Sequence, residues 1–231
     1  MTPLEGAKFF GIKNICLVVM EDKPVVAEFP QIADELSSLD KVVWSVFGNG
    51  GSKRTSDGGS DIAPMLEVAK SHPNIIAGVA DDFMNDARMK IYTPEIISGY
   101  RDRLHNEIGR KLDFWAVLYA HELADKIKPY LDVFDVITFW NWRADSLSAL
   151  DENLKRLQEL AGKCKPIYAG CYMWDYGNHK PMPMELMKMQ LEKYLEWYNE
   201  GKIKGVILCS NCIADIGLDT VDYTREWLLK H

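Results

Sequence analysis

Seven short apolar runs recur along the chain, and they constrain the fold more than any other feature of the sequence. Each has the length of a β-strand and is followed by a segment of helical character. A continuous apolar run of this length predicts a strand buried on both faces, as in a parallel sheet. The predicted strands span Ile12–Met20, Lys41–Phe47, Ile75–Ala80, Asp113–Ala120, Asp135–Trp140, Pro166–Tyr172 and Gly205–Cys209.

The segments between these runs carry helix signals. Thr93 is a candidate N-cap, and Pro64 falls in the first turn of another predicted helix. Leucines at helical spacing, from Leu147 to Leu160, form an apolar stripe. The predicted helices span Pro3–Phe10, Phe29–Leu39, Asp61–Ser71, Pro94–Leu112, Leu123–Leu131, Leu147–Gly162, Met184–Glu200 and Thr220–Lys230.

Alternating strands and helices predict a parallel sheet with right-handed crossovers. An open doubly wound sheet would carry a glycine-rich turn after its first strand, but here Glu21-Asp22-Lys23-Pro24 follows. The later segment Gly48–Lys53 matches neither phosphate-binding motif, and we interpret it as a mobile loop. The pattern favours one α/β domain over residues 1–231, a (β/α)8-type TIM barrel with seven visible strands whose first strand is missing or distorted.

Composition excludes several classes of function. The formal net charge of −7 argues against broad binding to nucleic acid, which depends on Lys and Arg. No run reaches the roughly 18 apolar residues of a membrane span, so we expect no membrane partner. The N-terminal residues lack the basic start and apolar middle of a signal peptide, which favours a cytoplasmic location.

The cysteines are odd in number and fall mostly in or beside apolar runs, which predicts reduced, buried thiols. Cys209-x-x-Cys212 has the spacing of a redox or zinc motif, but the chain has no second such pair and no His close by in sequence. We interpret it as structural. The cysteines are Cys16, Cys164, Cys171, Cys209 and Cys212.

Carboxylates follow several predicted strands, where a β/α barrel builds its active site. Asp81 and Asp82 are adjacent, and neighbouring like charges in a pocket raise one pKa so that one carboxyl can act as a general acid. The alternative is that one caps the next segment and the other pairs with a nearby cation, Arg88 or Lys90. His121-Glu122 and Asp175 follow two further strands, although Glu122 could instead open a helix.

Aromatic residues gather at the same strand ends. Their faces attract the C–H faces of sugar rings, and Tyr and Trp add a hydrogen-bonding group. Asn141 and Asn211 are suitable partners for hydroxyls or an amide. About half of the rings are expected to fill the core instead. The aromatic residues are Tyr119, Trp140, Trp142, Tyr172, Trp174 and Tyr176.

A metal site is the main competing interpretation. Suitable ligands are Asp82, His121, Glu122, Asp175 and His179, but they lie on different segments and form no tight motif such as HExxH. A Ser–His–Asp site has less support because no GxSxG turn is present. We therefore predict no cofactor and no bound metal.

These features resemble the TIM-barrel glycoside hydrolases. If the first visible strand is barrel strand two, Asp81-Asp82 follows strand four and Asp175 follows strand seven. Many retaining glycosidases place the acid/base and the nucleophile there, usually both as Glu. Some hexosaminidases that use substrate assistance carry an Asp-Asp pair after strand four. That resemblance implies that Asp81 orients the acetamido group and Asp82 protonates, with Asn141 and Tyr172 assisting.

We therefore expect a hydrolase that acts on a carbohydrate. The expected catalytic residues are Asp82, Asp81, Glu122 and Asp175. Two alternatives stay open: a metal-dependent sugar isomerase or hydrolase, and a non-catalytic glycan-binding barrel. The expected sugar-binding residues are Tyr119, His121, Trp140, Asn141, Trp142, Tyr172, Trp174 and Asn211.

Overall fold

The computed structural model describes residues 1–47, 53, 55 and 59–231, so most of the glycine-rich segment Gly48–Lys53 lies outside the described residues. All seven predicted strands are present in one sheet, in the order β1-β2-β3-β4-β5-β6-β9. The register is parallel. The fold is that of a (β/α)8-type barrel, of which seven strands lie among the described residues. These strands are β1 (Asn14–Leu17), β2 (Lys41–Phe47), β3 (Ile75–Ala80), β4 (Asp113–Tyr119), β5 (Val136–Trp140), β6 (Ile167–Tyr172) and β9 (Gly205–Cys209).

Helices follow the strands as the sequence predicts, with two additions. A short helix, α4, begins after the N-cap Asn85, whose side chain accepts a hydrogen bond from the Arg88 amide. A hairpin of two short antiparallel strands, β7 (Trp174–Asp175) and β8 (Lys180–Pro181), follows β6. The α-helices are α1 (Pro3–Phe10), α2 (Phe29–Glu35), α3 (Ile62–Ala69), α4 (Asp86–Ile91), α5 (Pro94–Asn106), α6 (Lys128–Leu131), α7 (Leu150–Ala161), α8 (Met184–Asn199) and α9 (Asp219–Leu228).

Short 3-10 turns connect these elements, and several of them end the strands at which the candidate site residues lie. The turns are η1 (Val26–Glu28), η2 (Leu36–Ser38), η3 (Ala120–Glu122), η4 (Asp125–Ile127), η5 (Ala144–Ala149), η6 (Tyr176–Asn178) and η7 (Asn211–Ile213).

The chain divides into two compact units, which we describe separately. The first comprises residues 1–12, 119–123 and 138–231, and the second comprises residues 13–118 and 124–137. Each unit carries strands of the same sheet. The interpretation of residues 1–231 as a single domain stays a prediction.

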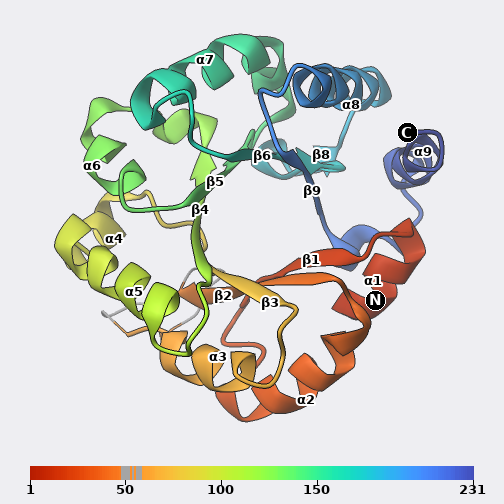
Figure 1. Cartoon of the computed structure of the whole chain (residues 1–231). Helices are drawn as coiled ribbons and strands as arrows, with labels where there is room; N and C mark the ends of the chain where they lie inside the picture. The colour runs from red at the N-terminus through yellow and green to blue at the C-terminus, as the bar shows by residue number, and fades with distance from the viewer. Residues whose placement is uncertain (48–52, 54, 56–58) are drawn as a thin grey trace. The chain divides into compact units, whose positions relative to one another are not determined.

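In the second unit, α2, α3 and α5 flank the strands β1, β2 and β3 (Figure 1). Six of the seven residues of β2 are buried, as expected for a strand covered on both faces. Gly78 of β3 allows a close approach of β2, because a Cβ there would lie 2.9 Å from a methyl of Val46. Arg110 donates hydrogen bonds to the carbonyls of Ile75, Ala69 and His72 and so ties the start of β3 to the end of α3.

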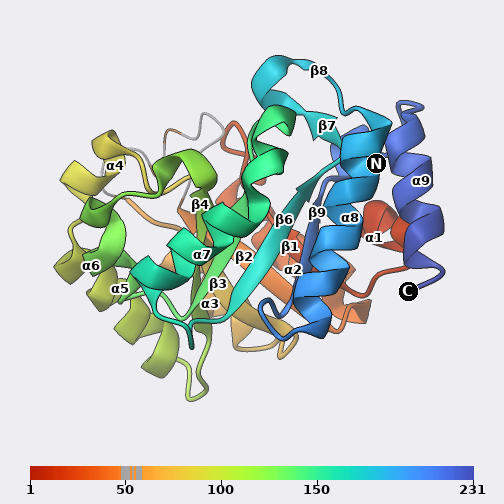
Figure 2. The ribbon, with the colours of Figure 1, turned by 90° about the horizontal axis from the view of Figure 1, so that it is seen from above.

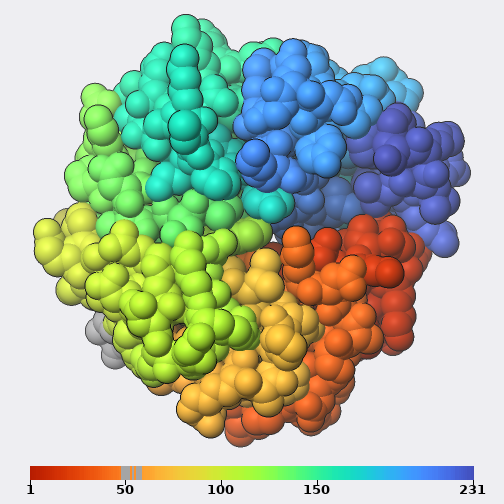
Figure 3. Space-filling model, in the orientation of Figure 1, coloured from red at the N-terminus to blue at the C-terminus, as the bar shows by residue number. Residues whose placement is uncertain are grey.

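In the first unit, α7 and α8 lie beside β6 and β9, and the β7–β8 hairpin lies beyond the C-terminal end of β6 (Figure 2). The predicted leucine stripe of α7 is buried. Two hydrogen-bonding contacts join α7 to α8: Trp197 and Lys193 both contact the carboxylate of Asp151. In the space-filling view the side chains of α7 and α8 adjoin (Figure 3).

Two local expectations need correction. Strand β1 is shorter than predicted, because Val18 and Met20 at the end of the apolar run are 45% and 65% exposed and not part of the sheet. The cysteines were expected to be buried, but only Cys171 is, whereas Cys164 and Cys212 are exposed. Within the described part of the chain, no helix has the length and apolarity to cross a membrane.

Candidate active site

Asp81 and Asp82 (the acidic pair) follow β3 in the second unit. The Asp81 amide donates a 2.9 Å hydrogen bond to the Phe47 carbonyl at the end of β2, which fixes the position of the pair. Asp82 has φ of +44°, in the left-handed region that costs energy for a residue with a Cβ. The Asn85 side chain donates to the Asp82 carbonyl and stabilises this turn. The N-cap of the next helix is Asn85 rather than either aspartate.

The two carboxyls differ in environment. Asp81 is 8% exposed, whereas Asp82 is half-buried. Burial, and after it the charge of Asp82, raise the pKa of Asp81 to about 7, while Arg88 acts in the opposite direction. One member of the pair therefore holds a proton near neutral pH, as like charges side by side require. A carboxyl of this kind can donate a proton at neutral pH.

Aromatic side chains meet at the strand ends of the first unit. Tyr119, Trp140 and Tyr172 are the last residues of β4, β5 and β6. The Trp140 and Tyr172 rings lie 4.9 Å apart, and the hydroxyls of Tyr119 and Tyr172 are 3.3 Å apart. Trp142 packs edge-on against both tyrosines. We call this group the aromatic cluster: Tyr119, His121, Trp140, Trp142, Tyr172 and Tyr176.

The cluster combines buried rings with accessible ones. Tyr119, Trp140 and Tyr172 are at most 9% exposed, whereas Trp142 is 38% exposed. His121 is exposed and stacks on Tyr119 at 5.4 Å. Roughly half of the predicted aromatics therefore fill the interior, as expected, and the others leave an accessible aromatic surface.

Tyr176 completes the cluster. Its ring lies 4.9 Å from Tyr172 and stacks on Trp142 at 5.9 Å. Tyr176 was expected among the aromatics at the strand ends but not among the sugar-binding residues. The signal in the sequence was its position directly after Trp174-Asp175. In the structure the turn after β7 folds back, and the Gly177 amide donates a hydrogen bond to the Trp142 carbonyl.

Two glycines make the cluster possible. A Cβ at Gly170 of β6 would lie 1.9 Å from the Trp140 ring, so only glycine lets the indole lie flat against this strand. A Cβ at Gly177 would lie 2.6 Å from Trp142. The local sequence therefore provides space for both indoles.

Asn141 lies between the two tryptophans in sequence but faces elsewhere. Neighbouring residues of a strand point to opposite faces, and Trp140 and Trp142 share the cluster side. Asn141 is 3% exposed, and its carboxamide makes no well-formed hydrogen bond to any described residue. It lies beside the Tyr194 phenol of α8, whose pKa is raised by burial and then by Cys171, with Asn141 acting in the opposite direction.

Glu122 and Asp175 both accept hydrogen bonds from the protein. Glu122 accepts a 2.9 Å bond from the Tyr119 amide in its own turn. Asp175 is 1% exposed, and its two oxygens accept from the Ala144 amide at 3.1 Å and from Asn178 at 2.9 Å. These bonds give each carboxylate a role in holding a strand-end turn. A catalytic role for either stays a prediction.

Trp174 and Asn211 have other neighbours. Trp174 pairs with Pro181 in the hairpin. Asn211, in the turn η7, lies against α1: its side chain donates to the Met1 carbonyl, and its Cβ fills the space over Gly6. Both residues lie in the first unit, but the contacts found for them are structural.

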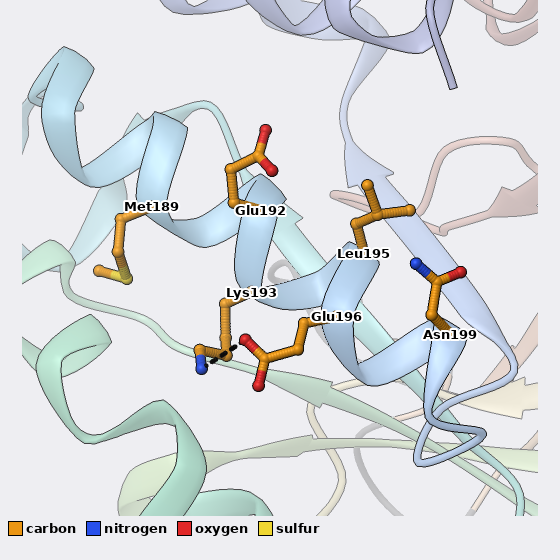
Figure 4. Close-up of a pocket in the computed structure, with 6 residues that line it drawn as sticks. All are labelled: Met189, Glu192, Lys193, Leu195, Glu196 and Asn199. Atoms are coloured by element: carbon orange, nitrogen blue, oxygen red, sulfur yellow. Dashed lines mark hydrogen bonds and ion pairs between the residues drawn. The ribbon is translucent and has the colours of Figure 1, made fainter.

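No group of three or more His, Cys, Asp or Glu side chains among the described residues could hold a metal ion. A shallow depression of about 440 Å³ lies along α8 (Figure 4). Its lining comes from one helix, and Lys193 there is already paired with Glu196 at 2.8 Å. The depression therefore offers no converging set of polar groups. Its residues are Met189, Glu192, Lys193, Leu195, Glu196 and Asn199.

No protein-family model and no curated protein sequence matches the chain. Solved structures with a similar fold include an apo β-glucuronidase from Ruminococcus gnavus, with a TM-score of 0.53 and 12% identity over 96% of this chain and 44% of that one. Another is a family 18 chitinase from Crocus vernus, with a TM-score of 0.55 and 13% identity over 87% of this chain and 75% of that one. At this identity the similarity shows the fold alone. The chain spans less than half the length of the β-glucuronidase.

Proposed function

We propose that this chain is a carbohydrate-acting hydrolase. The observation that carries the proposal is the aromatic cluster, in which an accessible indole, Trp142, lies over two tyrosines whose hydroxyls are 3.3 Å apart. An exposed aromatic face suits a sugar ring, because the ring presents C–H groups on its faces. The cluster lies at the strand ends, where enzymes of this fold bind substrate.

Asp81 is the proposed proton donor. Its buried carboxyl, with a pKa of about 7, would give its proton to the glycosidic oxygen as the bond from that oxygen to the anomeric carbon breaks. In an N-acetylhexosaminide the acetamido oxygen of the substrate would form the new bond to the anomeric carbon, and water would then displace it. The resemblance to hexosaminidases implies that Asp82 is the proton donor. The greater burial of Asp81 favours exchanging the two roles, so that Asp82 orients the substrate.

The choice of sugar rests on three observations. An adjacent pair of aspartates resembles that of hexosaminidases which use the acetamido group of the substrate, and one structure of similar fold is a chitinase. Another is a β-glucuronidase. We therefore propose N-acetylhexosaminides as the first substrates to test and glucuronides as the second.

A non-catalytic glycan-binding barrel is the second candidate. It is favoured by the hydrogen bonds that occupy Glu122 and Asp175, two of the four carboxylates expected to act in catalysis. On this alternative the aromatic cluster binds a sugar and the acidic pair has no chemical task.

The test is hydrolysis of a panel of chromogenic glycosides by the wild type and by Asp81→Asn, with Asp132→Asn at an exposed position as the matched control. The proposal predicts turnover of at least one glycoside, its loss by at least about 100-fold in Asp81→Asn and no change in the control. Turnover that EDTA abolishes would favour the metal-dependent alternative. Sugar binding without turnover would favour the binding barrel.

A further inference from the structure

Cys209 and Cys212 lie together at the end of β9. Cys209 is the last residue of the strand, and Cys212 belongs to the turn η7, which closes through a hydrogen bond from the Ile213 amide to the Ser210 carbonyl. Cys209 is half-buried and Cys212 is exposed. The sequence favours a structural role for this pair, but Cys212, as an exposed residue, contributes little to packing.

Polar side chains surround the two thiols. The hydroxyl of Tyr176 interacts with both thiols, and the Ser210 hydroxyl lies 3.0 Å from the Cys212 sulfur. Burial raises the pKa of the Tyr176 phenol, and the two cysteines raise it further. The phenol therefore stays protonated and can donate a hydrogen bond to a sulfur. The turn between the two cysteines is short, with Cys212 three residues after Cys209 and inside the 3-10 turn that begins directly after the strand.

We propose that Cys209 and Cys212 form a reversible dithiol–disulfide site, with Cys212 as the accessible sulfur and Cys209 as the resolving one. The spacing of three residues across a tight turn is that of redox dithiols. The inference does not depend on the proposed hydrolase activity, since it rests on these thiols and their neighbours alone.

The chemistry is an exchange with a small-molecule disulfide such as oxidised glutathione. The Cys212 thiolate attacks one glutathione sulfur, the bond between the two glutathione sulfurs breaks and one glutathione leaves. The Cys209 sulfur then attacks the Cys212 sulfur of the mixed disulfide, and the second glutathione leaves. The two cysteines are oxidised, oxidised glutathione is reduced to two thiols, and the two cysteine protons end on those thiols.

Mass spectrometry after treatment with oxidised glutathione tests the proposal. Trypsin releases residues 205–225 as one peptide that contains both cysteines and no other. The expected result is a peptide lighter by two hydrogen atoms, restored by dithiothreitol. Cys164, exposed and distant in sequence, is the internal control and should carry only a glutathione adduct. A stable glutathione adduct on Cys212 in the wild type would overturn the proposal.

Single variants and a dithiol-specific probe give a second test. In Cys209→Ser, Cys212 should retain the glutathione that the wild type releases. Phenylarsine oxide bridges two neighbouring thiols with loss of water, so the untreated wild type should retain one arsenical per chain. Cys209→Ser and Cys212→Ser should lose it, and Cys164→Ser should keep it. Failure of the wild type to retain the arsenical would contradict the proximity of the two thiols, whatever the stability of the variants.

Discussion

The phenolic oxygens of Tyr119 and Tyr172 lie 3.3 Å apart, at the ends of β4 and β6. Both side chains are buried, so each hydroxyl relies on a partner inside the protein. The contact links two strand ends with the tryptophans packed around them. It is therefore the central polar contact of the aromatic cluster.

The contact predicts an energetic coupling. Tyr119→Phe and Tyr172→Phe should each lower the free energy of unfolding by about 1 kcal/mol, because each removes one hydroxyl of a buried interacting pair. The double variant should cost less than the sum, with a coupling of about 0.5–1 kcal/mol. Urea unfolding measures all three, and Tyr198→Phe at an exposed position is the control. Strict additivity would mean that the hydroxyls do not interact.

Asp81 predicts a pH dependence of stability. Its pKa is raised to about 7 by burial and by Asp82, so the folded chain holds a proton that the unfolded chain loses near pH 4. Stability should therefore fall as pH rises from about 4 to about 7. Asp81→Asn removes this dependence and should raise Tm more at pH 8 than at pH 4.

The adjacent carboxylate provides the control for this experiment. Asp82→Asn removes a charge that raises the pKa of Asp81, so the pH window should move down without disappearing. Thermal unfolding over pH 4–8 distinguishes the two variants. An increase in Tm that is the same at every pH for Asp81→Asn would contradict the raised pKa of Asp81.

Asp135, which lies directly before β5, should give stability the opposite dependence on pH. Burial alone would raise the pKa of its carboxyl, but hydrogen bonds from His105 and from the Phe114 amide, both 2.8 Å, together with the charges of His105 and Lys111, lower it. Its contribution to stability is present above pH 4 and is lost as pH falls through the lowered pKa. Asp135→Asn should cost about 1–3 kcal/mol at pH 7.

The loss of stability caused by Asp135→Asn should become smaller toward pH 3, because the Asp135 carboxyl of the wild type then loses its charge as well. Asp113→Asn is the matched control, since Asp113 is 40% exposed and pairs only with Lys111 among the ion pairs described. Chemical unfolding at the two pH values gives the comparison. A cost that is independent of pH would mean that the charge of Asp135 is not involved.

We predict that a side chain at position 170 clashes with the Trp140 ring. Gly170→Ala would place a Cβ within 1.9 Å of the Trp140 ring, so either the strand or the indole must move. We expect a loss of about 3 kcal/mol or more, with a changed tryptophan emission. Gly99→Ala, in an exposed part of α5 with nothing within 4 Å of the new Cβ, should instead stabilise by about 0.5–1 kcal/mol. Unchanged stability of Gly170→Ala would show that Trp140 does not pack as described.

The strands were predictable from sequence because a strand covered on both faces must be apolar along its whole length. β2, β3 and β9 match their predicted bounds. β1 does not, because an apolar run such as Ile12–Met20 does not reveal where burial ends. α4 escaped prediction because six residues after a polar stretch give too short a pattern for periodicity to register.

The site was predictable only in part. Sequence indicates that a residue follows a strand, which sufficed for Tyr119, Trp140 and Tyr172. It does not reveal tertiary partners, so the hydrogen bonds of Asp175 and the packing of Asn211 on α1 could not be expected. Asp81 and Asp82 are adjacent in sequence, and only burial distinguishes them.

Direct binding of saccharides tests the central claim, that the aromatic cluster holds a sugar. Saturation-transfer NMR with methyl glycosides, including N-acetylhexosaminides and glucuronides, should find at least one ligand of the wild type. Trp142→Ala should weaken that binding about tenfold, because it removes the accessible aromatic face. Tyr198→Ala, at an exposed position on α8, should leave it unchanged. Binding that is unaffected by Trp142→Ala, or no binding by the folded wild type to any saccharide of the panel, would contradict the account.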